Sequence, residues 1–359
     1  MPGEIVVVGA GVVGSAIGWR LADTGQRVTL VDPTPGGLAS PGSFAWLNAS
    51  FADDAVYNRL RHDSLELWRR LKTADGSVPI EFAGAVLWEQ EHFDLDEIAR
   101  SQSVLGRPAE LIDGATLAQR VPALRRMPDR ALHLLGDGYG DPIEITSWFL
   151  DQAVAAGAEI AAERIEEILV DAGAVTGVRT AARAIPASHV VVAAGIDLPS
   201  VLAMLGLDVA MANEPGLLAS TSPGSVIVDT MLATPDVHLW QRDDGGFLIG
   251  ADFGGGSDFD EPQANANRVL DALQSLVEGT EECSVERVTV RERPIPADGR
   301  PAIGPLGPDG LYVVSTHSGM TLAPLIAECV TREIGGNGAD PRLAPYRPGR
   351  AALRQASAG

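Results

Sequence analysis

Cysteine, positive charge and long apolar runs are all scarce in this sequence. The two cysteines, Cys283 and Cys329, form neither a metal-binding spacing nor a disulfide framework, so we expect inert thiols in a reducing, cytoplasmic setting. No apolar stretch reaches the length of a membrane-spanning helix, and we expect no stable membrane insertion. The first predicted strand begins within about four residues of Met1, which leaves no room for a signal peptide.

The shortage of positive charge limits the possible partners. The chain has 27 Lys and Arg residues against 48 Asp and Glu, which gives a formal net charge of −21 at pH 7. This charge disfavours nucleic acid or an anionic membrane surface as a partner. A small anionic substrate is still compatible, because a few buried arginines can set the local potential. At 359 residues the chain is long enough for two compact units with large cores.

The clearest motif lies in residues 4–32. A β-branched run at residues 5–8 predicts a parallel strand buried on both faces. Three glycines then follow at GxGxxG spacing: Gly9, Gly11 and Gly14. They allow a tight turn, the close approach of a pyrophosphate and tight packing of the next helix. Asp32 ends the second strand, where a carboxylate can accept a hydrogen bond from a ribose 2′-hydroxyl but would repel the 2′-phosphate of NADP. The unit predicts an adenine dinucleotide and leaves FAD and NAD both open.

The rest of the chain predicts that this sheet is interrupted by a second, antiparallel region. Asp141-Pro142-Ile143-Glu144 is typical of a helix start, with Asp141 as N-cap. Residues 237–242 and 247–251 flank Asp243-Asp244-Gly245-Gly246, which predicts a hairpin with His238 and Trp240 on one face. Residues 189–192 form a buried strand that ends in Ala193-Ala194-Gly195, so the dinucleotide sheet is expected to resume there.

Three further segments carry expectations about organisation. Residues 57–71 predict a helix, and its apolar stripe is Leu60, Leu67, Trp68 and Leu71. Residues 90–135 are charged and broken by prolines, so we expect short helices at best. The tail after Gly335 is rich in Gly, Pro and Arg and is expected on the surface.

Several motifs together resemble one enzyme superfamily. Besides GxGxxG and Ala193-Ala194-Gly195, residues 293–304 read RPxxxDGxPxIG, and a strand, Thr316-His317-Ser318-Gly319 and a helix close the chain. This pattern resembles the D-amino-acid oxidase, glycine oxidase and sarcosine oxidase superfamily over nearly the whole chain, and glycine oxidases most closely. The resemblance implies FAD as cofactor and an α/β fold in which a Rossmann-like FAD-binding domain is interleaved with a substrate domain built on an antiparallel sheet. We assign residues 1–84, 140–212 and 287–359 to the FAD-binding domain and residues 85–139 and 213–286 to the substrate-binding domain.

The resemblance also implies site residues. Arg293 matches the arginine that binds the substrate carboxylate, His238 falls where glycine oxidases carry a pocket tyrosine, and Trp46 falls in the loop against the flavin. The expected cofactor contacts are Gly9, Gly11, Val12, Val13, Gly14, Asp32, Ser43, Ala45, Trp46, Ile165, Ala194, Gly195, Arg293, His317, Ser318, Gly319, Met320 and Thr321. Arg291 stands near the place where sarcosine oxidases attach flavin through a cysteine, so FAD is expected to be non-covalent. No metal site is expected.

The residues alone leave other interpretations open. Arg293 could form a surface ion pair with neighbouring Glu292 or with Asp298. His238 could line a pocket, accept a proton from the substrate ammonium or hydrogen-bond in a core. Trp240 could wall an apolar pocket, which together with Trp46 would favour an N-substituted glycine, or it could belong to the core. His317 and Ser318 could favour negative charge on the flavin or simply cap a helix.

The expected function is the FAD-dependent oxidation of an amine next to a carboxylate. Glycine or an N-substituted glycine would give glyoxylate and an amine, and O₂ or another acceptor would reoxidise the cofactor. Two related alternatives are an FAD-dependent D-amino-acid dehydrogenase and a 2-hydroxy-acid oxidase. An NAD-dependent dehydrogenase and a non-catalytic flavin-binding scaffold are the remaining classes.

Overall fold

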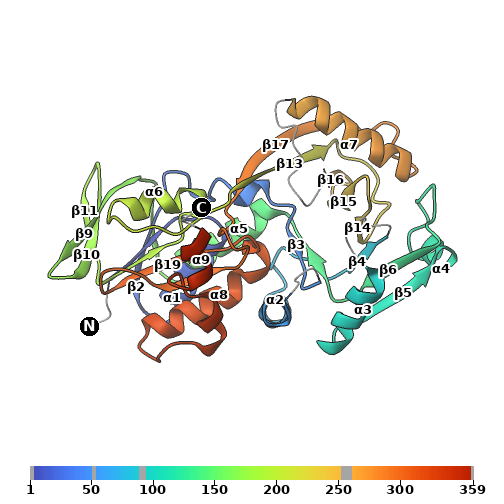
Figure 1. Ribbon diagram of the computed structural model, residues 1–359. Helices are drawn as coiled ribbons and strands as arrows, with labels where there is room; N and C mark the ends of the chain where they lie inside the picture. The colour runs from blue at the N-terminus through green and yellow to red at the C-terminus, as the bar shows by residue number, and fades with distance from the viewer. Residues whose placement is uncertain (1–3, 51–53, 89–93, 252–260, 357–359) are drawn as a thin grey trace.

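Two large sheets lie side by side in the computed structural model, which describes residues 4–50, 54–88, 94–251 and 261–356 (Figure 1). The six-stranded sheet has the order β18-β19-β12-β1-β2-β8, and the eight-stranded sheet has the order β17-β13-β16-β15-β14-β4-β6-β5. The first sheet contains β1 (Glu4–Val8), β2 (Arg27–Val31), β8 (Glu159–Ala161), β12 (His189–Val192), β18 (Ala302–Pro305) and β19 (Leu311–Ser315). The second contains β4 (Ala85–Leu87), β5 (Ala109–Asp113), β6 (Arg130–Leu134), β13 (Glu214–Thr221), β14 (Met231–Ala233), β15 (His238–Gln241), β16 (Phe247–Gly250) and β17 (Val285–Arg293). This mixed α/β architecture confirms the predicted fold class.

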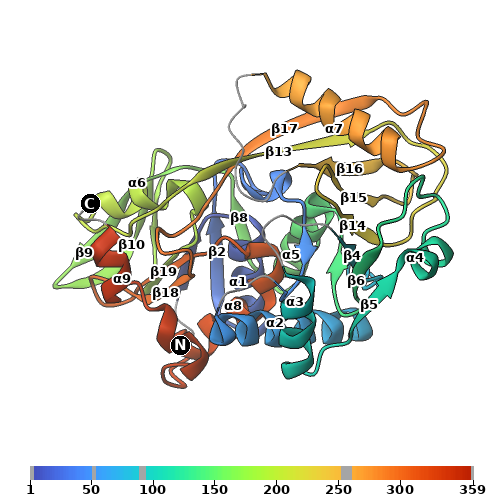
Figure 2. The same cartoon turned by 45° about the vertical axis from the view of Figure 1, so that its right-hand side comes forward.

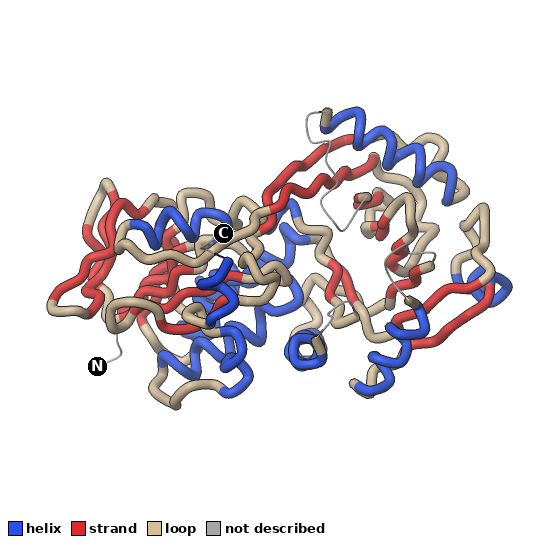
Figure 3. The backbone as a smooth tube through the Cα atoms, viewed as in Figure 1, coloured by secondary structure: helices blue, strands red, loops and turns tan. Residues whose placement is uncertain are grey.

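Helices flank both sheets, and α2 lies between the two halves of the molecule (Figure 3). They are α1 (Val12–Asp23), α2 (Ala55–Ala74), α3 (Leu95–Val104), α4 (Gly114–Arg120), α5 (Pro142–Ala155), α6 (Leu198–Ala203), α7 (Pro262–Leu276), α8 (Gly319–Ile334) and α9 (Ala351–Ala356). Short 3-10 turns occur at η1 (Ser40–Gly42), η2 (Gly195–Asp197) and η3 (Pro341–Tyr346). Smaller sheets are formed by β9 (Ile165–Asp171), β10 (Ala174–Thr180) and β11 (Ala184–Pro186), and by β3 (Trp46–Leu47) with β7 (Gly138–Tyr139). In the described ranges, no helix has the length and apolarity needed to cross a bilayer.

The six-stranded sheet is covered on both faces. Strand β1 lies between β12 and β2 and runs parallel to both. Side chains alternate along it, so Ile5 and Val7 enter a core shared with α1, α5 and α8, while Val6 and Val8 enter a core with α6 and the β11-β10-β9 sheet. This double cover accounts for the continuous β-branched run, because neither face of β1 meets solvent.

Local signals placed several elements correctly. Asp141 caps α5 as predicted, since one carboxylate oxygen accepts from the backbone N–H of Ile143 at 2.8 Å and of Glu144 at 3.2 Å. Strands β15 and β16 form the predicted antiparallel hairpin, with His238 opposite Gly250. One face of the eight-stranded sheet packs on α7, which lies along β13 and β17 in Figure 3.

Two expectations about organisation were wrong in part, and a third was confirmed. Residues 94–135 contain helices α3 and α4 but also strands β5 and β6, which extend the eight-stranded sheet; residues 90–93 lie outside the described ranges. The tail does not simply lie on the surface, because η3 buries Leu343 and Tyr346 in the same core as α8. Helix α2 has the predicted apolar stripe, because Leu60 and Trp68 are buried and the half-buried Leu67 and Leu71 pack against the same core. The buried positions of α2 also include Tyr57, Asn58, Arg61, Ser64 and Leu65.

Candidate active site

A cavity of about 850 Å³ lies between the two sheets. The carboxyl ends of β1, β2 and β12 form one side, and β13, β15 and β17 contribute to the other. Ligands of open α/β sheets bind outside the carboxyl ends of the strands, and small-molecule and cofactor sites measure roughly 300–1,000 Å³. The volume and position are therefore those of a cofactor and substrate site.

Most predicted site residues meet at this cavity. Its lining includes Gly9, Gly11, Val12, Val13, Asp32, Ser43, Ala45, Trp46, Ile165, Ala194, Gly195, His238, Arg293, His317, Ser318, Gly319, Met320 and Thr321. Gly14 and Trp240 are predicted site residues that do not belong to the lining.

The glycine motif forms a turn that has no room for side chains. Gly9 has φ +103°, and a Cβ there would lie 2.3 Å from the carbonyl oxygen of Ala193. A Cβ on Gly14 would lie 1.9 Å from the carbonyl oxygen of Gly9, so Gly14 lets α1 pack against the turn. Helix α1 then begins with neither a side-chain cap nor an acidic residue in its first turn. Its N-terminal amides and positive dipole end suit a pyrophosphate, so these residues fit a dinucleotide.

Asp32 lines the cavity and also accepts hydrogen bonds from two backbone N–H groups. Its Oδ2 accepts from the backbone N–H of Ala10 at 2.7 Å, and its Oδ1 accepts from that of Thr34 at 2.7 Å. Burial raises the pKa of this carboxyl despite those two hydrogen bonds. Each oxygen keeps a further lone pair, so a ribose hydroxyl can still bind.

The segment after η1 brings aromatic side chains to the cavity. Ala45 has φ +53°, which an L-residue adopts only when its surroundings hold it there. Ser43 Oγ supports the turn by accepting from the N–H of Ala45 at 3.1 Å. The next residue, Trp46, is buried and donates from Nε1 to Asp137.

The start of α8 supplies a second open helix N-terminus. Ser318 occupies the N-cap position but its side chain makes no capping hydrogen bond; instead Ser318 Oγ accepts from Tyr57 Oη at 3.1 Å. The first turn of α8 contains no acidic residue, so its amides can stabilise negative charge in the cavity. The imidazole of His317 is accessible from the cavity yet closely surrounded by protein. Burial, then the charges of Arg293 and Arg61, lower its pKa to about 4.

Arg293 ends β17 and lines the cavity. Its Nη2 donates to the carbonyl oxygen of Pro215 at 3.1 Å and lies 3.7 Å from a carboxylate oxygen of Glu214. Asp298, one of the acids suggested by the sequence as its partner, is bound by Arg350 at 2.6 Å. The guanidinium is therefore positioned by a neighbouring strand at the edge of the cavity.

His238 and Trp240 share a face of β15 but have different surroundings. His238 is 5% exposed and lines the cavity, with the ring of Phe44 at 6.4 Å. Trp240 donates from Nε1 to the carbonyl oxygen of Phe44 at 3.0 Å and stacks on Tyr139 at 5.2 Å. Trp240 therefore holds the segment that carries Phe44, while Trp46 is the tryptophan that lines the cavity.

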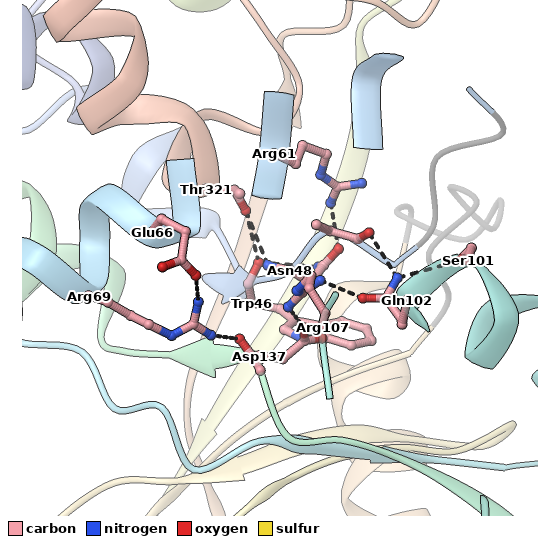
Figure 4. A network of polar contacts seen from close by, with 12 residues as sticks. Trp46, Asn48, Arg61, Glu66, Arg69, Ser101, Gln102, Arg107, Asp137 and Thr321 are labelled. Atoms are coloured by element: carbon pink, nitrogen blue, oxygen red, sulfur yellow. Dashed lines mark hydrogen bonds and ion pairs between the residues drawn. The ribbon is translucent and has the colours of Figure 1, made fainter. Parts of the chain in front are cut away.

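Sequence reasoning missed several polar lining residues, among them Asn48, Tyr57 and Arg61. Arg61 points toward Asn48 in Figure 4, and its Nη2 donates to Asn48 Oδ1 at 2.6 Å. A signal for it exists in the sequence, because Arg61 follows Tyr57 by four residues and precedes Leu65 by four. An arginine on the inward stripe of a helix is seldom buried unless it has a partner.

A Rossmann-type sheet with a glycine cradle and an antiparallel sheet with an arginine line one cavity. This combination defines a dinucleotide-dependent oxidoreductase. More narrowly, residues 4–333 match the family described as FAD dependent oxidoreductase (DAO), and the chain belongs to that family. FAD is therefore its cofactor. Neither Cys283 nor Cys329 lines the cavity, which agrees with FAD held without a covalent bond.

Named relatives span almost the whole chain. The chain is 26% identical to a D-amino acid dehydrogenase of Cereibacter sphaeroides, with 98% of each covered. It is 27% identical to a glycine oxidase of Pseudomonas putida, with 97% of this chain and 99% of the relative covered. The crystal structure of glycine oxidase from Geobacillus kaustophilus superposes with a TM-score of 0.85 at 22% identity and covers 97% of this chain and 99% of that one. That structural likeness establishes the shared fold.

Proposed function

We propose that this chain oxidises an amine next to a carboxylate, namely glycine or an N-substituted glycine, to glyoxylate and the freed amine, with O₂ as the final acceptor and H₂O₂ as its product. The observation that carries the proposal is that the guanidinium of Arg293 lines the same cavity as the glycine cradle. The two named relatives at 26% and 27% identity both act, by their names, on amino acids, which supports it.

Arg293 is proposed to hold the substrate carboxylate. A guanidinium can form two parallel hydrogen bonds with a carboxylate, which fixes both the position and the angle of the α-carbon. The contacts of Arg293 with Pro215 and Glu214 place the guanidinium before the substrate arrives.

The amine must react in its neutral form, because the nitrogen lone pair makes the new C=N bond as the α-C–H bond breaks. Bound FAD supplies the hydride acceptor for this chemistry. Water then adds to the imine carbon and releases the amine. A free alkylammonium has a pKa of about 10, so we assign His238 as a wall of the pocket that can also accept the ammonium proton.

The ranges given above for the two domains are also proposed. Every strand of the six-stranded sheet falls within residues 1–84, 140–212 and 287–359, which supports assigning these ranges to FAD binding. Strand β17 crosses the proposed boundary at residue 287 and belongs to the other sheet. A cytoplasmic location is proposed from the low cysteine content.

Anaerobic stopped-flow reduction of the purified yellow holoenzyme tests the reaction. Glycine, N-methylglycine, D-alanine and glycolate are compared across pH. We expect the amino acids to bleach the flavin, with rates that rise with pH as the neutral amine accumulates. Bleaching by glycolate alone would replace this proposal with a 2-hydroxy-acid oxidase.

A D-amino-acid dehydrogenase is the second candidate, favoured by the similarity to the Cereibacter sphaeroides enzyme. The two candidates differ in substrate and in acceptor. Faster reduction by D-alanine than by glycine, with turnover that needs an artificial electron acceptor in place of O₂, would identify the dehydrogenase.

A further inference from the structure

The cavity contains a buried cation for which the proposed reaction gives no role. Arg61 lies on the inward face of α2, is 8% exposed and lines the cavity. Its Nη2 donates to Asn48 Oδ1 at 2.6 Å, and its guanidinium carbon lies 5.6 Å from the ring centre of Tyr57. Within the described part of the chain, its buried Nε has no hydrogen-bond partner. A neutral amide and an aromatic ring therefore face this guanidinium, and it keeps donors for a ligand.

The nearby acid is already taken by another arginine. Asp137 is fully buried, and Arg107 Nη2 binds its Oδ1 at 2.5 Å. Arg107 is further satisfied by Gln102 Oε1 at 2.7 Å, and Asp137 also accepts from Trp46 Nε1 at 2.9 Å (Figure 4). Among the described residues, Asp137 is the one carboxylate whose charge acts on Arg61.

The local charges therefore do not balance. Among the described residues, Arg61 and Arg107 are buried guanidiniums near the buried carboxylate of Asp137, which Arg107 binds directly. These three side chains together carry an excess of one positive charge. A buried charge without a partner is costly, and burial lowers the pKa of Arg61 for that reason. In a chain with a net charge of −21, this excess points to an anion that arrives with a ligand.

Arg293 is a second guanidinium whose charge, like that of Arg61, reaches the imidazole of His317. The charges of both Arg293 and Arg61 act on His317 and lower its pKa. The pyrophosphate cradle is formed elsewhere, by Gly9, Gly11 and the start of α1, where Ser40 Oγ accepts from the N–H of Val12 at 3.0 Å. Within the described residues the lining contains five arginines, and Arg61 and Arg293 are the two whose charges act on His317.

We propose that Arg61 binds a second anionic group of the substrate, so that the substrate is an amine with two carboxylates, one bound by Arg293 and the other by Arg61. This inference rests on the proposed function. An N-carboxymethyl amine or an amino dicarboxylic acid has the required groups. The second carboxylate compensates the buried charge, which no amino acid with a single carboxylate can do while it is bound to Arg293.

Paired substrates test this specificity. Iminodiacetate and N-methylglycine are both secondary amines and differ in the second carboxylate; D- and L-aspartate are compared with D- and L-alanine in the same way. The wild-type holoenzyme should favour the diacid of a pair in kcat/KM by roughly 30-fold or more, the effect of a buried charge pair. Arg61→Gln should abolish that preference, and Arg61→Lys should retain part of it. Arg59→Gln is the control, because Arg59 lies on the exposed side of α2 beside Asp63 and should leave the ratio unchanged.

Binding of ligands that cannot be oxidised tests the anion site at Arg61 separately from the proposed amine oxidation. Succinate and butyrate are titrated into the holoenzyme, and the absorbance of bound FAD is followed. Tighter binding of succinate that disappears in Arg61→Gln supports the anion site even if no amine is oxidised, in which case the proposed function alone fails. Oxidation of amines without a diacid preference in the wild type overturns this inference and leaves the proposed function intact. Loss of FAD from both Arg61 variants also overturns it, because the guanidinium would then serve the cofactor.

Discussion

Trp46 donates a hydrogen bond of 2.9 Å from Nε1 to Oδ2 of Asp137, a residue 91 positions further along the chain. The backbones of the same two segments also pair, because Trp46 of β3 lies opposite Tyr139 of β7. Because Asp137 is also bound by Arg107, one cavity-lining side chain is tied to a buried ion pair. The wall of the cavity is thus held by groups that belong to distant parts of the sequence.

Replacing Trp46 by Phe should destabilise the protein. The change removes a donor and leaves an oxygen of Asp137 buried with one hydrogen bond fewer, which costs about 1–3 kcal/mol of the free energy of unfolding. Urea unfolding of the holoenzyme measures this. Trp148→Phe is the matched control, because the Nε1 of Trp148 donates to Ser77 Oγ, a group that water can replace more easily. Equal stability of the Trp46→Phe variant and wild type would contradict the role given to this contact.

Gly11→Val should abolish FAD binding. A Cβ added at Gly11 would lie 3.0 Å from Ser40 Oγ, and the branched side chain of valine would occupy the space that a pyrophosphate needs. The ratio of flavin to protein absorbance after purification measures the loss, and circular dichroism checks the fold. Gly76→Ala is the control, since a Cβ there meets nothing within 4 Å. Stoichiometric FAD in Gly11→Val would move the cofactor away from the cradle.

Arg293→Ala should lower kcat/KM by roughly 30-fold or more, because one partner of a buried, charge-assisted pair is removed. The absorbance spectrum of FAD should stay as in the wild type. Arg287→Ala on the same strand is the control, because Arg287 is exposed and lies outside the cavity lining. Near-native kinetics of Arg293→Ala would remove this arginine from the substrate site.

His317 should titrate with a pKa of about 4 in wild type, below its usual 6.5, and Arg61→Gln should raise this pKa because a neighbouring cation is lost. Since the pKa is lower in the folded state, the unfolded state binds the extra proton between about pH 6.5 and pH 4. The contribution of His317 to stability is therefore complete above about pH 6.5 and decreases as the pH falls toward 4.

NMR of isotope-labelled histidine in the holoenzyme measures these values. His189 is the internal control, because its pKa is lowered by burial alone and should not respond to Arg61→Gln. A His317 pKa above 6.5 in the wild type would contradict the electrostatic description of the cavity.

Short-range patterns in the sequence were sufficient for several elements. The strand, glycine turn and helix from Glu4 to Asp23 follow from β-branching, glycine spacing and helical periodicity, all of which act within a few residues. The cap at Asp141 and the β15–β16 hairpin are equally local. The resemblance added the cofactor, because it joined the glycine motif to segments near the other end of the chain.

Tertiary structure decided the rest. Strands β5 and β6 owe their pairing to each other and to β4, contacts that their own composition does not specify. Trp240 and His238 lie on the same face of β15, so their sequence pattern does not distinguish them. In the fold, Trp240 contacts Phe44 and Tyr139, whereas His238 lines the cavity. In the sequence, Arg61 is one of several charged residues of a helix. Its charge becomes significant because the fold buries it beside Asn48, while Arg107 binds the nearby carboxylate of Asp137.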